Sequence, residues 1–287
     1  MDSGNGAWTP GLVPLRPLAV TEILDGAVRV VWARRAAVFA LAAPLAVAVA
    51  VVRALASYAS VGDLSFALPS LAAQLLLPAL LGTIVTGLIA PVVSGAAIGD
   101  DVGPGDSVRR VAGLAPGLVV LAVVLTVCEG VGLAVLLVGG AFLWGIWAVA
   151  APAAVAERLG PFAALRRSFT LVRGDFWRAW GTRALGWLVT YVVAAVATVP
   201  FELLALAVSG GDPFEDASVD RPLLYLAVVA IGQVIACLLT VPVSSAIDVL
   251  LYLDLRMRRE GMDIVMALPP APTPATEYLP PRVGPQW

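Results

Sequence analysis

The sequence of 287 residues contains no histidine, and all 18 of its basic residues are arginine, so lysine is absent as well. These two absences exclude several kinds of catalytic site. A Walker A phosphate loop and a pyridoxal Schiff base each need a lysine, and most zinc sites and acid/base dyads use histidine. We therefore expect no enzyme of these classes, no metal site and no cofactor.

Charged residues of either sign are also scarce. They make up 13% of the chain, hydrophobic residues make up 60%, and the mean hydropathy is +0.93. A soluble domain has about 25% charged residues, so this chain has too few to cover a soluble surface. The composition indicates a polytopic membrane protein without a nucleic-acid partner. The two cysteines, Cys128 and Cys237, lie in apolar stretches, and we expect buried small side chains there rather than a disulfide.

Six stretches are long and apolar enough to cross a bilayer, whose hydrocarbon core of about 30 Å needs about 20 helical residues. Pro69 and Pro78 predict an interfacial lead-in before the second span, and Pro242 should bend the sixth. The third and fourth spans should form a hairpin that turns around Gly130 and Gly132. The predicted spans are 36–56, 74–98, two within 111–156, 184–208 and 223–253.

The expected fold is all-α: a polytopic membrane protein of six transmembrane helices, with interfacial amphipathic helices before spans one and five. A flexible N-terminal segment should occupy residues 1–19 and the six-helix membrane domain residues 20–263. Residues 264–287 are rich in proline, which predicts a disordered C-terminal tail.

The first amphipathic helix precedes the first span. Thr21 can cap it, and Glu22 and Asp25 place negative charge in its first turn. We expect this helix to lie along the cytoplasmic membrane surface. Its apolar residues with helical spacing are Ile23, Leu24, Ala27, Val28, Val31 and Trp32.

The second amphipathic helix follows the break at Gly160 and Pro161 and precedes the fifth span. Its predicted apolar stripe consists of Phe162, Leu165, Phe169 and Val172. We expect the arginines of this region to meet anionic headgroups of the bilayer or a cytoplasmic protein partner. These arginines are Arg166, Arg167, Arg173, Arg178 and Arg183.

The distribution of arginine predicts the orientation. Of the 18 arginines, 16 fall on the side that holds both termini, and only Arg53 and Arg221 fall on the other side. By the positive-inside rule both termini are cytoplasmic, and we expect a multi-pass protein of the plasma membrane. Trp32, Trp177, Trp180 and Trp187 should form the inner aromatic belt, with Trp144 and Trp147 toward the outer one.

Four ionisable residues interrupt the spans, and such residues mark functional sites in membrane proteins. Arg53, Glu129 and Glu202 each lie about 25–27 Å from the cytoplasmic edge at about 1.5 Å per residue. We expect an ion pair or triad in this layer, with separate snorkelling and a proton or ion relay as alternatives. Asp248 should lie at the cytoplasmic boundary, paired with an arginine such as Arg166, Arg167 or Arg183.

At the exit of the last helix, Asp254 is followed by three arginines, Arg256, Arg258 and Arg259. We interpret this group as a solvated anchor on the cytoplasmic side.

Three blocks of sequence resemble an actinobacterial family of membrane proteins known as glycerophosphoryl diester phosphodiesterase membrane-domain proteins. They are residues 16–26, residues 157–177 (ERLGPFAALRRSFTLVRGDFW) and residues 251–261 (LYLDLRMRREG). In some relatives a similar module is fused to a phosphodiesterase barrel, which uses histidines and a metal-binding acid pair. Because this chain has no histidine and no room for a barrel, the resemblance transfers no catalytic residue. The resemblance implies a genomic setting, in which the gene lies near genes for a MoxR-type ATPase and for transglutaminase-like envelope proteins.

The leading functional hypothesis is a non-catalytic accessory or scaffold protein of the cell envelope with an arginine-rich cytoplasmic face. The alternative is a transporter or permease for a small molecule or ion that uses the kinked second, fifth and sixth helices. An intramembrane enzyme is third. A midplane cavity reaching Gln233 or Thr86 would favour transport, whereas dry packing would favour a scaffold. Residues that could line a transport path are Thr83, Thr86, Thr190, Gln233 and Thr240.

Overall fold

The computed structural model describes residues 16–59, 65, 67–135, 137–209 and 223–261, and within these ranges it is helical and has no strand. Six helical segments are long and apolar enough to cross a membrane, as predicted, and the fourth of them, Val138–Ala156, comprises α6 and α7. The elements are α1 (Val20–Ala33), α2 (Arg35–Ala59), α3 (Ala67–Ile98), α4 (Pro104–Ala112), α5 (Ala115–Val135), α6 (Leu137–Ile146), α7 (Ala150–Ala156), α8 (Pro161–Val172), α9 (Phe176–Ser209) and α10 (Leu223–Glu260). The predicted tail at 264–287 and most of the predicted segment at 1–19 lie outside the described residues.

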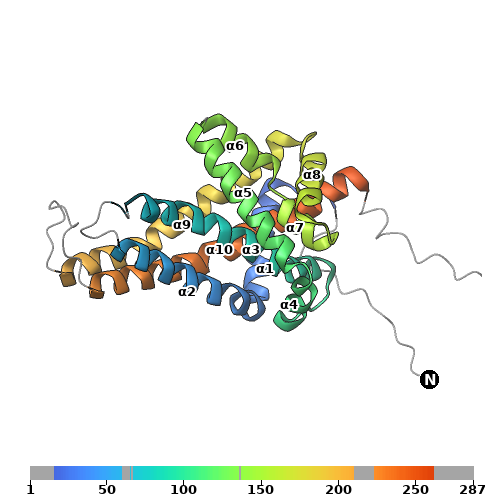
Figure 1. Cartoon of the computed structure of the whole chain (residues 1–287). Coiled ribbons are helices and arrows are strands. Elements are labelled where there is room, and N and C mark those ends of the chain that lie inside the picture. The colour runs from blue at the N-terminus through green and yellow to red at the C-terminus, as the bar shows by residue number, and fades with distance from the viewer. Residues whose placement is uncertain (1–15, 60–64, 66, 136, 210–222, 262–287) are drawn as a thin grey trace, which may run out of the picture.

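Four long helices, α2, α3, α9 and α10, run beside one another, and α5 and α6 form a hairpin on one flank (Figure 1). The short helices α1, α4, α7 and α8 gather at one end of this bundle, where α9 begins and α10 finishes. We call this end the basic end because α4, α8 and the last turns of α10 bring their arginines there. The opposite end, where α2 and α9 finish and α3 and α10 begin, we call the apolar end.

Three helices are longer than a bilayer core. At about 1.5 Å per residue, the 32, 34 and 38 residues of α3, α9 and α10 span about 48, 51 and 57 Å, against about 30 Å of hydrocarbon. α9 begins at Phe176 rather than at residue 184, and α10 continues to Glu260 rather than ending near residue 253. The predicted boundaries were placed at charges, but the charged residues of these two helices pair with each other and the helices continue.

The start of the second span also differs from the prediction. α3 is one continuous helix from Ala67, with no separate lead-in. Pro69 lies in its first turn, where a backbone N–H has no helical partner to lose. Pro78 and Pro91 lie inside the helix, and neither ends it.

The turn between the third and fourth spans is displaced as well. α5 continues past Gly130 and Gly132 to Val135. A Cβ at Gly132 would lie 3.0 Å from the Cα of Gly140 in α6. Gly132 therefore allows close approach of two helices and does not form the turn.

The fourth span is broken at residues 147–149, between α6 and α7. A side chain from α8 satisfies backbone groups on both sides of the break. The hydroxyl of Ser168 donates to the carbonyl of Ile146 at 2.9 Å and accepts from the N–H of Val149 at 3.3 Å. The break is thus a stable part of the fold, because a buried serine satisfies the backbone groups on both sides of it.

The first amphipathic helix packs on protein along one face. Its Ile23, Ala27 and Val30 are buried against α10, α2 and α3, while Val28 and Trp32 are exposed. The predicted cap is also wrong, because Ala19 precedes the first turn and its N–H donates to Glu22 at 2.7 Å. The buried stripe is a protein contact, while the location of this helix along the membrane surface stays a prediction.

The second amphipathic helix, α8, begins at Pro161 as the sequence indicates, but its buried face is different. Ala164, Ser168 and Leu171 are buried, whereas Phe162 and Phe169 are exposed. Of the predicted stripe only Val172 is fully buried. The hydropathy pattern missed this face because small and hydroxyl side chains allow α8 to approach α7 closely.

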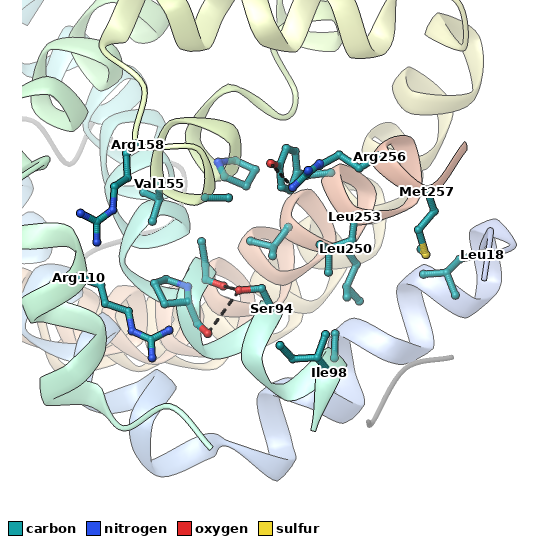
Figure 2. Close-up of a pocket in the computed structure, with 17 residues that line it drawn as sticks. Leu18, Ser94, Ile98, Arg110, Val155, Arg158, Leu250, Leu253, Arg256 and Met257 are labelled. Atoms are coloured by element: carbon teal, nitrogen blue, oxygen red, sulfur yellow. Dashed lines mark hydrogen bonds between the residues drawn. The ribbon is translucent and has the colours of Figure 1, made fainter. Parts of the chain in front are cut away.

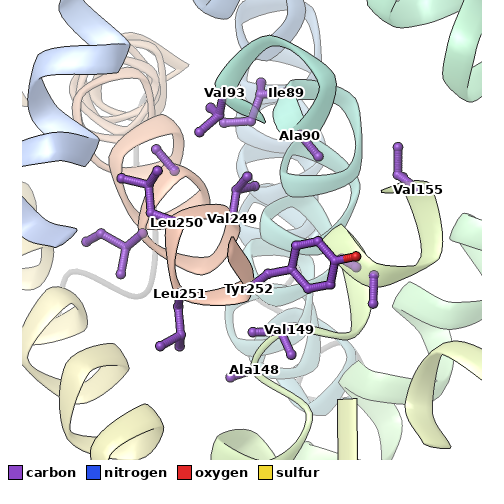
Figure 3. Close-up of a cluster of buried hydrophobic side chains, with 14 of the residues drawn as sticks. Ile89, Ala90, Val93, Ala148, Val149, Val155, Val249, Leu250, Leu251 and Tyr252 are labelled. Atoms are coloured by element: carbon purple, nitrogen blue, oxygen red, sulfur yellow. The ribbon is translucent and has the colours of Figure 1, made fainter. Parts of the chain in front are cut away.

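The core lies toward the basic end. Figure 3 shows Tyr252 pointing from α10 toward the α7 region, close to Val149 and Val155, with Val93 of α3 nearby. The Tyr252 hydroxyl donates to Glu157 at 2.8 Å. Burial of the tyrosine ring with its hydroxyl satisfied fixes α10 against α7.

The short helix α4 was not predicted. Its buried Ser107 donates to the carbonyl of Leu88 in α3 at 2.5 Å. Val111 on the same face is also buried. This helix therefore covers the end of α3 at the basic end.

Candidate functional site

The charges within the spans do not form the predicted layer. Arg53 donates from Nε to the side-chain carbonyl of Gln74 at 2.6 Å, and Gln74 in turn donates to Ser57 at 2.9 Å. Glu202 is exposed on α9. Among the described residues neither Glu129 nor Glu202 forms an ion pair with Arg53. The predicted triad is wrong because an amide in the adjacent helix α3 satisfies the guanidinium first.

Asp248 has the kind of partner that was predicted. Arg183 of α9 approaches it with Nε at 3.2 Å from Oδ1 and Nη2 at 3.4 Å from Oδ2. Arg183 also donates to the backbone carbonyl of Trp144, and its guanidinium carbon lies 4.6 Å from the centre of that indole ring. Trp144 makes an edge-to-face contact with Trp180 at 6.5 Å. The two tryptophans therefore lie together and not in opposite aromatic belts.

A cavity of about 160 Å³ lies beside this pair, and we call it the embedded-charge pocket. Its charged lining residues are Glu129 of α5, Arg183 of α9 and Asp248 of α10. Glu129 is within electrostatic reach of both other charges, yet no ion pair to it is formed in the part of the chain that the structure describes. The cavity also carries the hydroxyls of Thr83, Thr86, Ser244 and Ser245.

The break in the fourth span forms one wall of this pocket. Trp147 and Ala148, at the break, line the cavity together with Trp144. Thr83 and Thr86 face it from the middle of α3, about 24 and 29 Å from the start of that helix at about 1.5 Å per residue. Non-helical backbone at membrane depth is tolerated where it lines a cavity, which is the arrangement here.

Two of the five residues expected along a transport path reach the pocket. The Thr86 hydroxyl donates to the carbonyl of Gly82 at 2.7 Å and is hydrogen-bonded to the Ser245 hydroxyl at 2.9 Å, which joins α3 to α10. Thr190 and Thr240 instead donate to carbonyls of their own helices, and they and Gln233 are not among the residues that line the cavity. The serines and tryptophans of the pocket have no sequence signal that distinguishes them from other apolar-span residues.

The acid at the exit of the last helix is not solvated. Asp254 has 0% relative exposure. It accepts from the Leu18 N–H at 2.7 Å, from Arg258 at 3.0 Å and from Arg178 at 3.2 Å. Both arginines also donate to the Leu18 carbonyl. The predicted solvated anchor is in fact a buried link between α1, α9 and α10.

Three of the five arginines expected to face lipid or a partner are bound within the protein. Arg178 and Arg183 pair with acids of α10, and Arg167 pairs with Glu157 at 2.8 Å and with Glu260. Burial alone would lower the pKa of Arg167, but the hydrogen bonds with Glu157 and Glu260 outweigh it and raise the pKa of the guanidinium. Only Arg166 and Arg173 remain exposed as expected. Sequence could not separate the two groups, because the partners lie far away along the chain.

Within the described ranges, no group of three or more Cys, Asp and Glu side chains lies close enough to hold a metal ion. The two cysteines are unpaired. Comparisons with known protein families, with characterised proteins and with solved structures found no match for this chain. The functional argument therefore rests on the geometry of the chain itself.

Proposed function

We propose that the protein is a membrane transporter for a small cation, the proton included, which binds in the embedded-charge pocket. The observation that carries the proposal is the location of Glu129 beside the Arg183–Asp248 pair. Two carboxylates face one guanidinium, so the ionised pocket has a net charge of −1. An intramembrane carboxylate without an arginine partner attracts a cation.

The size and position of the pocket support this class of substrate. A volume of about 160 Å³ corresponds to about five water molecules at ~30 Å³ each, which suits an ion with a few waters. Discontinuous helices commonly surround ion sites in secondary transporters. The break between α6 and α7 at this pocket is consistent with that arrangement.

The test is flux through the full-length protein in liposomes. Vesicles loaded with the pH dye pyranine report proton movement under a potassium diffusion potential, and parallel vesicles report uptake of radioactive sodium. Glu129→Gln removes the charge of the pocket with little change in volume, and we expect the flux to fall at least tenfold. The matched control is Glu202→Gln, which removes an exposed carboxylate of α9 outside the pocket.

The outcomes separate the proposal from its alternatives. Flux that is lost in Glu129→Gln and kept in Glu202→Gln supports cation transport. Wild-type flux equal to that of empty vesicles for both ions contradicts it, as does equal flux in wild type and Glu129→Gln.

We infer that the basic end faces the cytoplasm and that the protein resides in the plasma membrane without catalytic activity. Support for the orientation comes from the 16 arginines on the side of the termini against two on the other. Fusing green fluorescent protein or alkaline phosphatase to the C-terminus tests this. Fluorescence without phosphatase activity is the expected result, and the reverse pattern would contradict the orientation.

A scaffold function is a second candidate, favoured by the outer face of α8. Arg166 and Arg173 are exposed there together with Phe162, which has 71% relative exposure, and Phe169. Such a mixture of cations and aromatics suits a protein surface or a membrane interface. Purification from native membranes tests it: a stoichiometric envelope protein that is lost in Arg166→Gln/Arg173→Gln supports a scaffold. A solitary wild-type protein contradicts it.

A further inference from the structure

A second and larger pocket lies at the basic end, and we call it the arginine pocket. Its volume is about 320 Å³, and its walls come from α3, α4, α7 and α10. Arg110, Arg158 and Arg256 line it, and no acidic side chain is among the described residues that do so. Figure 2 shows Arg110 and Arg158 on one side of the pocket and Arg256 on the other. The charge of this lining is opposite to that of the embedded-charge pocket.

The positive charges of two of these arginines are not paired with an acid of the described residues. Arg110 and Arg158 are exposed, and neither forms an ion pair with any residue that the structure describes. The acid next to Arg158, Glu157, is occupied by Arg167 at 2.8 Å and by the Tyr252 hydroxyl at 2.8 Å. The pocket therefore presents at least two positive charges that pair with no carboxylate in the described part of the chain.

The third arginine is held in place by its own helix. Arg256 pairs with Glu260 one turn later at 2.9 Å, and its Nη1 lies 3.4 Å from the Tyr252 hydroxyl. Its guanidinium carbon lies 5.7 Å from the centre of the Tyr252 ring. Arg256 is thus positioned on the wall, and its charge is balanced by Glu260.

The backbone at Arg158 is unusual. Its φ of 53° is the only positive value at a non-glycine position in the described ranges. The left-handed region costs an ordinary residue about 1 kcal/mol or more. This conformation lies in the turn between α7 and α8 and directs Arg158 to the side of the pocket that holds Arg110 (Figure 2).

The rest of the wall is apolar, with Ile98, Val155, Leu250, Leu253 and Met257 among its residues. Paired guanidinium groups match the geometry of a phosphate, which they bind through charge-assisted hydrogen bonds. We propose that the arginine pocket binds the phosphate group of an anionic phospholipid, with the phosphate at Arg110 and Arg158 and an acyl chain along the apolar wall. A free phosphate could make the same contact with Arg110 and Arg158, but it has no acyl chain to lie along the apolar wall.

Native mass spectrometry of the detergent-solubilised full chain tests this proposal, with phosphatidylglycerol, phosphatidylcholine and inorganic phosphate added separately. We expect the wild type to retain phosphatidylglycerol at least tenfold better than phosphatidylcholine. Arg110→Gln/Arg158→Gln should reduce the affinity for phosphatidylglycerol at least tenfold. The matched control, Arg29→Gln/Arg35→Gln, removes two exposed arginines outside the pocket and should leave the affinity unchanged.

The results distinguish the two sources of phosphate. If inorganic phosphate binds with the same dependence on Arg110 and Arg158 while phosphatidylglycerol does not bind, the lipid assignment is overturned. If phosphatidylglycerol binds equally well to wild type and the double variant, the pocket is not the site. Should the double variant fail to fold, two single variants decide the question. Arg158→Lys should keep phosphatidylglycerol binding, and Arg110→Gln should weaken that binding severalfold. The opposite pattern overturns the proposal.

Discussion

The two ends of the α9–α10 pair are held by different forces. At the basic end, Arg178 and Arg258 surround the buried Asp254, and Asp175 pairs with Arg259 at 3.0 Å. At the apolar end the same helices expose large aliphatic side chains. Examples of these are Leu203, Leu204, Leu223 and Leu224. The basic end is thus stabilised by contacts within the protein, whereas the apolar end presents a large aliphatic surface that lipid can cover. Stability in detergent should accordingly depend on the basic end.

The largest expected effect follows from removing the central acid of the basic end. Asp254→Ala leaves two arginines without their shared carboxylate and the Leu18 N–H without an acceptor. Removing one partner of a buried ion pair costs about 3–5 kcal/mol, so we expect a loss of about that size in the free energy of unfolding. Thermal unfolding in detergent measures it. Glu202→Ala, which removes an exposed acid near the apolar end, should change little, and an equal loss in both variants would erase the difference between the ends.

Leucine truncation compares the apolar contacts of the same two ends. Leu251→Ala removes a fully buried side chain near the basic end and should cost about 2–5 kcal/mol. Leu204→Ala removes a side chain with 51% relative exposure and should cost about 0.5 kcal/mol or less. Denaturation followed by tryptophan fluorescence checks both. A larger loss in Leu204→Ala would mean that a protein contact covers the apolar end.

A smaller effect is expected from the contact between the two helices of the α5–α6 hairpin. Gly132→Ala places a methyl group 3.0 Å from the Gly140 Cα, and because backbone cannot rotate away we expect a loss of about 1–3 kcal/mol. The matched control is Gly181→Ala within α9, where nothing lies within 4 Å of the added atom. That variant should be neutral or slightly more stable, since alanine favours helix. Equal midpoints of thermal unfolding for the two variants would refute close approach of the hairpin helices.

The smallest effect concerns the exposed pair Arg34–Asp101 at the basic end. A hydrogen bond from Arg34 and its positive charge lower the pKa of Asp101. A lowered pKa means that the pair stabilises the protein above the unfolded-state pKa of about 3.9 and that this contribution is lost as the pH falls through the folded-state pKa. The difference in unfolding midpoint between wild type and Asp101→Asn should therefore shrink between pH 7 and pH 3. In an Arg34→Gln background the same substitution should have no effect at any pH.

The sequence predicted the elements of the fold better than their contacts. The six spanning helices follow from uncharged runs, which depend only on composition along the chain. The starts of the second and fifth spans were placed too late, at Gln74 and after Arg183, because a proline in a first turn does not break a helix and a charge paired with another helix does not end a span. The partners of Arg53 and Asp254 required tertiary information.

The candidate site was predictable only in part. Glu129 and Asp248 were recognisable as charges in apolar runs, and Thr86 as a polar residue near a proline-containing helix. Their convergence depends on the break at residues 147–149, and this break depends on Ser168 in another helix. No local pattern around residue 147 indicates it, since the span is apolar throughout.

The hydrogen bond between Leu18 and Asp254 joins residues 236 positions apart, and it constrains the order of assembly. Ribosomes deliver the N-terminus first, so α1 emerges long before the helix on which it docks. Until α10 has been inserted, the apolar stripe of Ile23, Ala27 and Val30 has no complete protein surface to cover it. α1 precedes the other described helices in the chain and is thus among the last of them to reach its native position, and a nascent chain stalled before residue 254 cannot complete the fold.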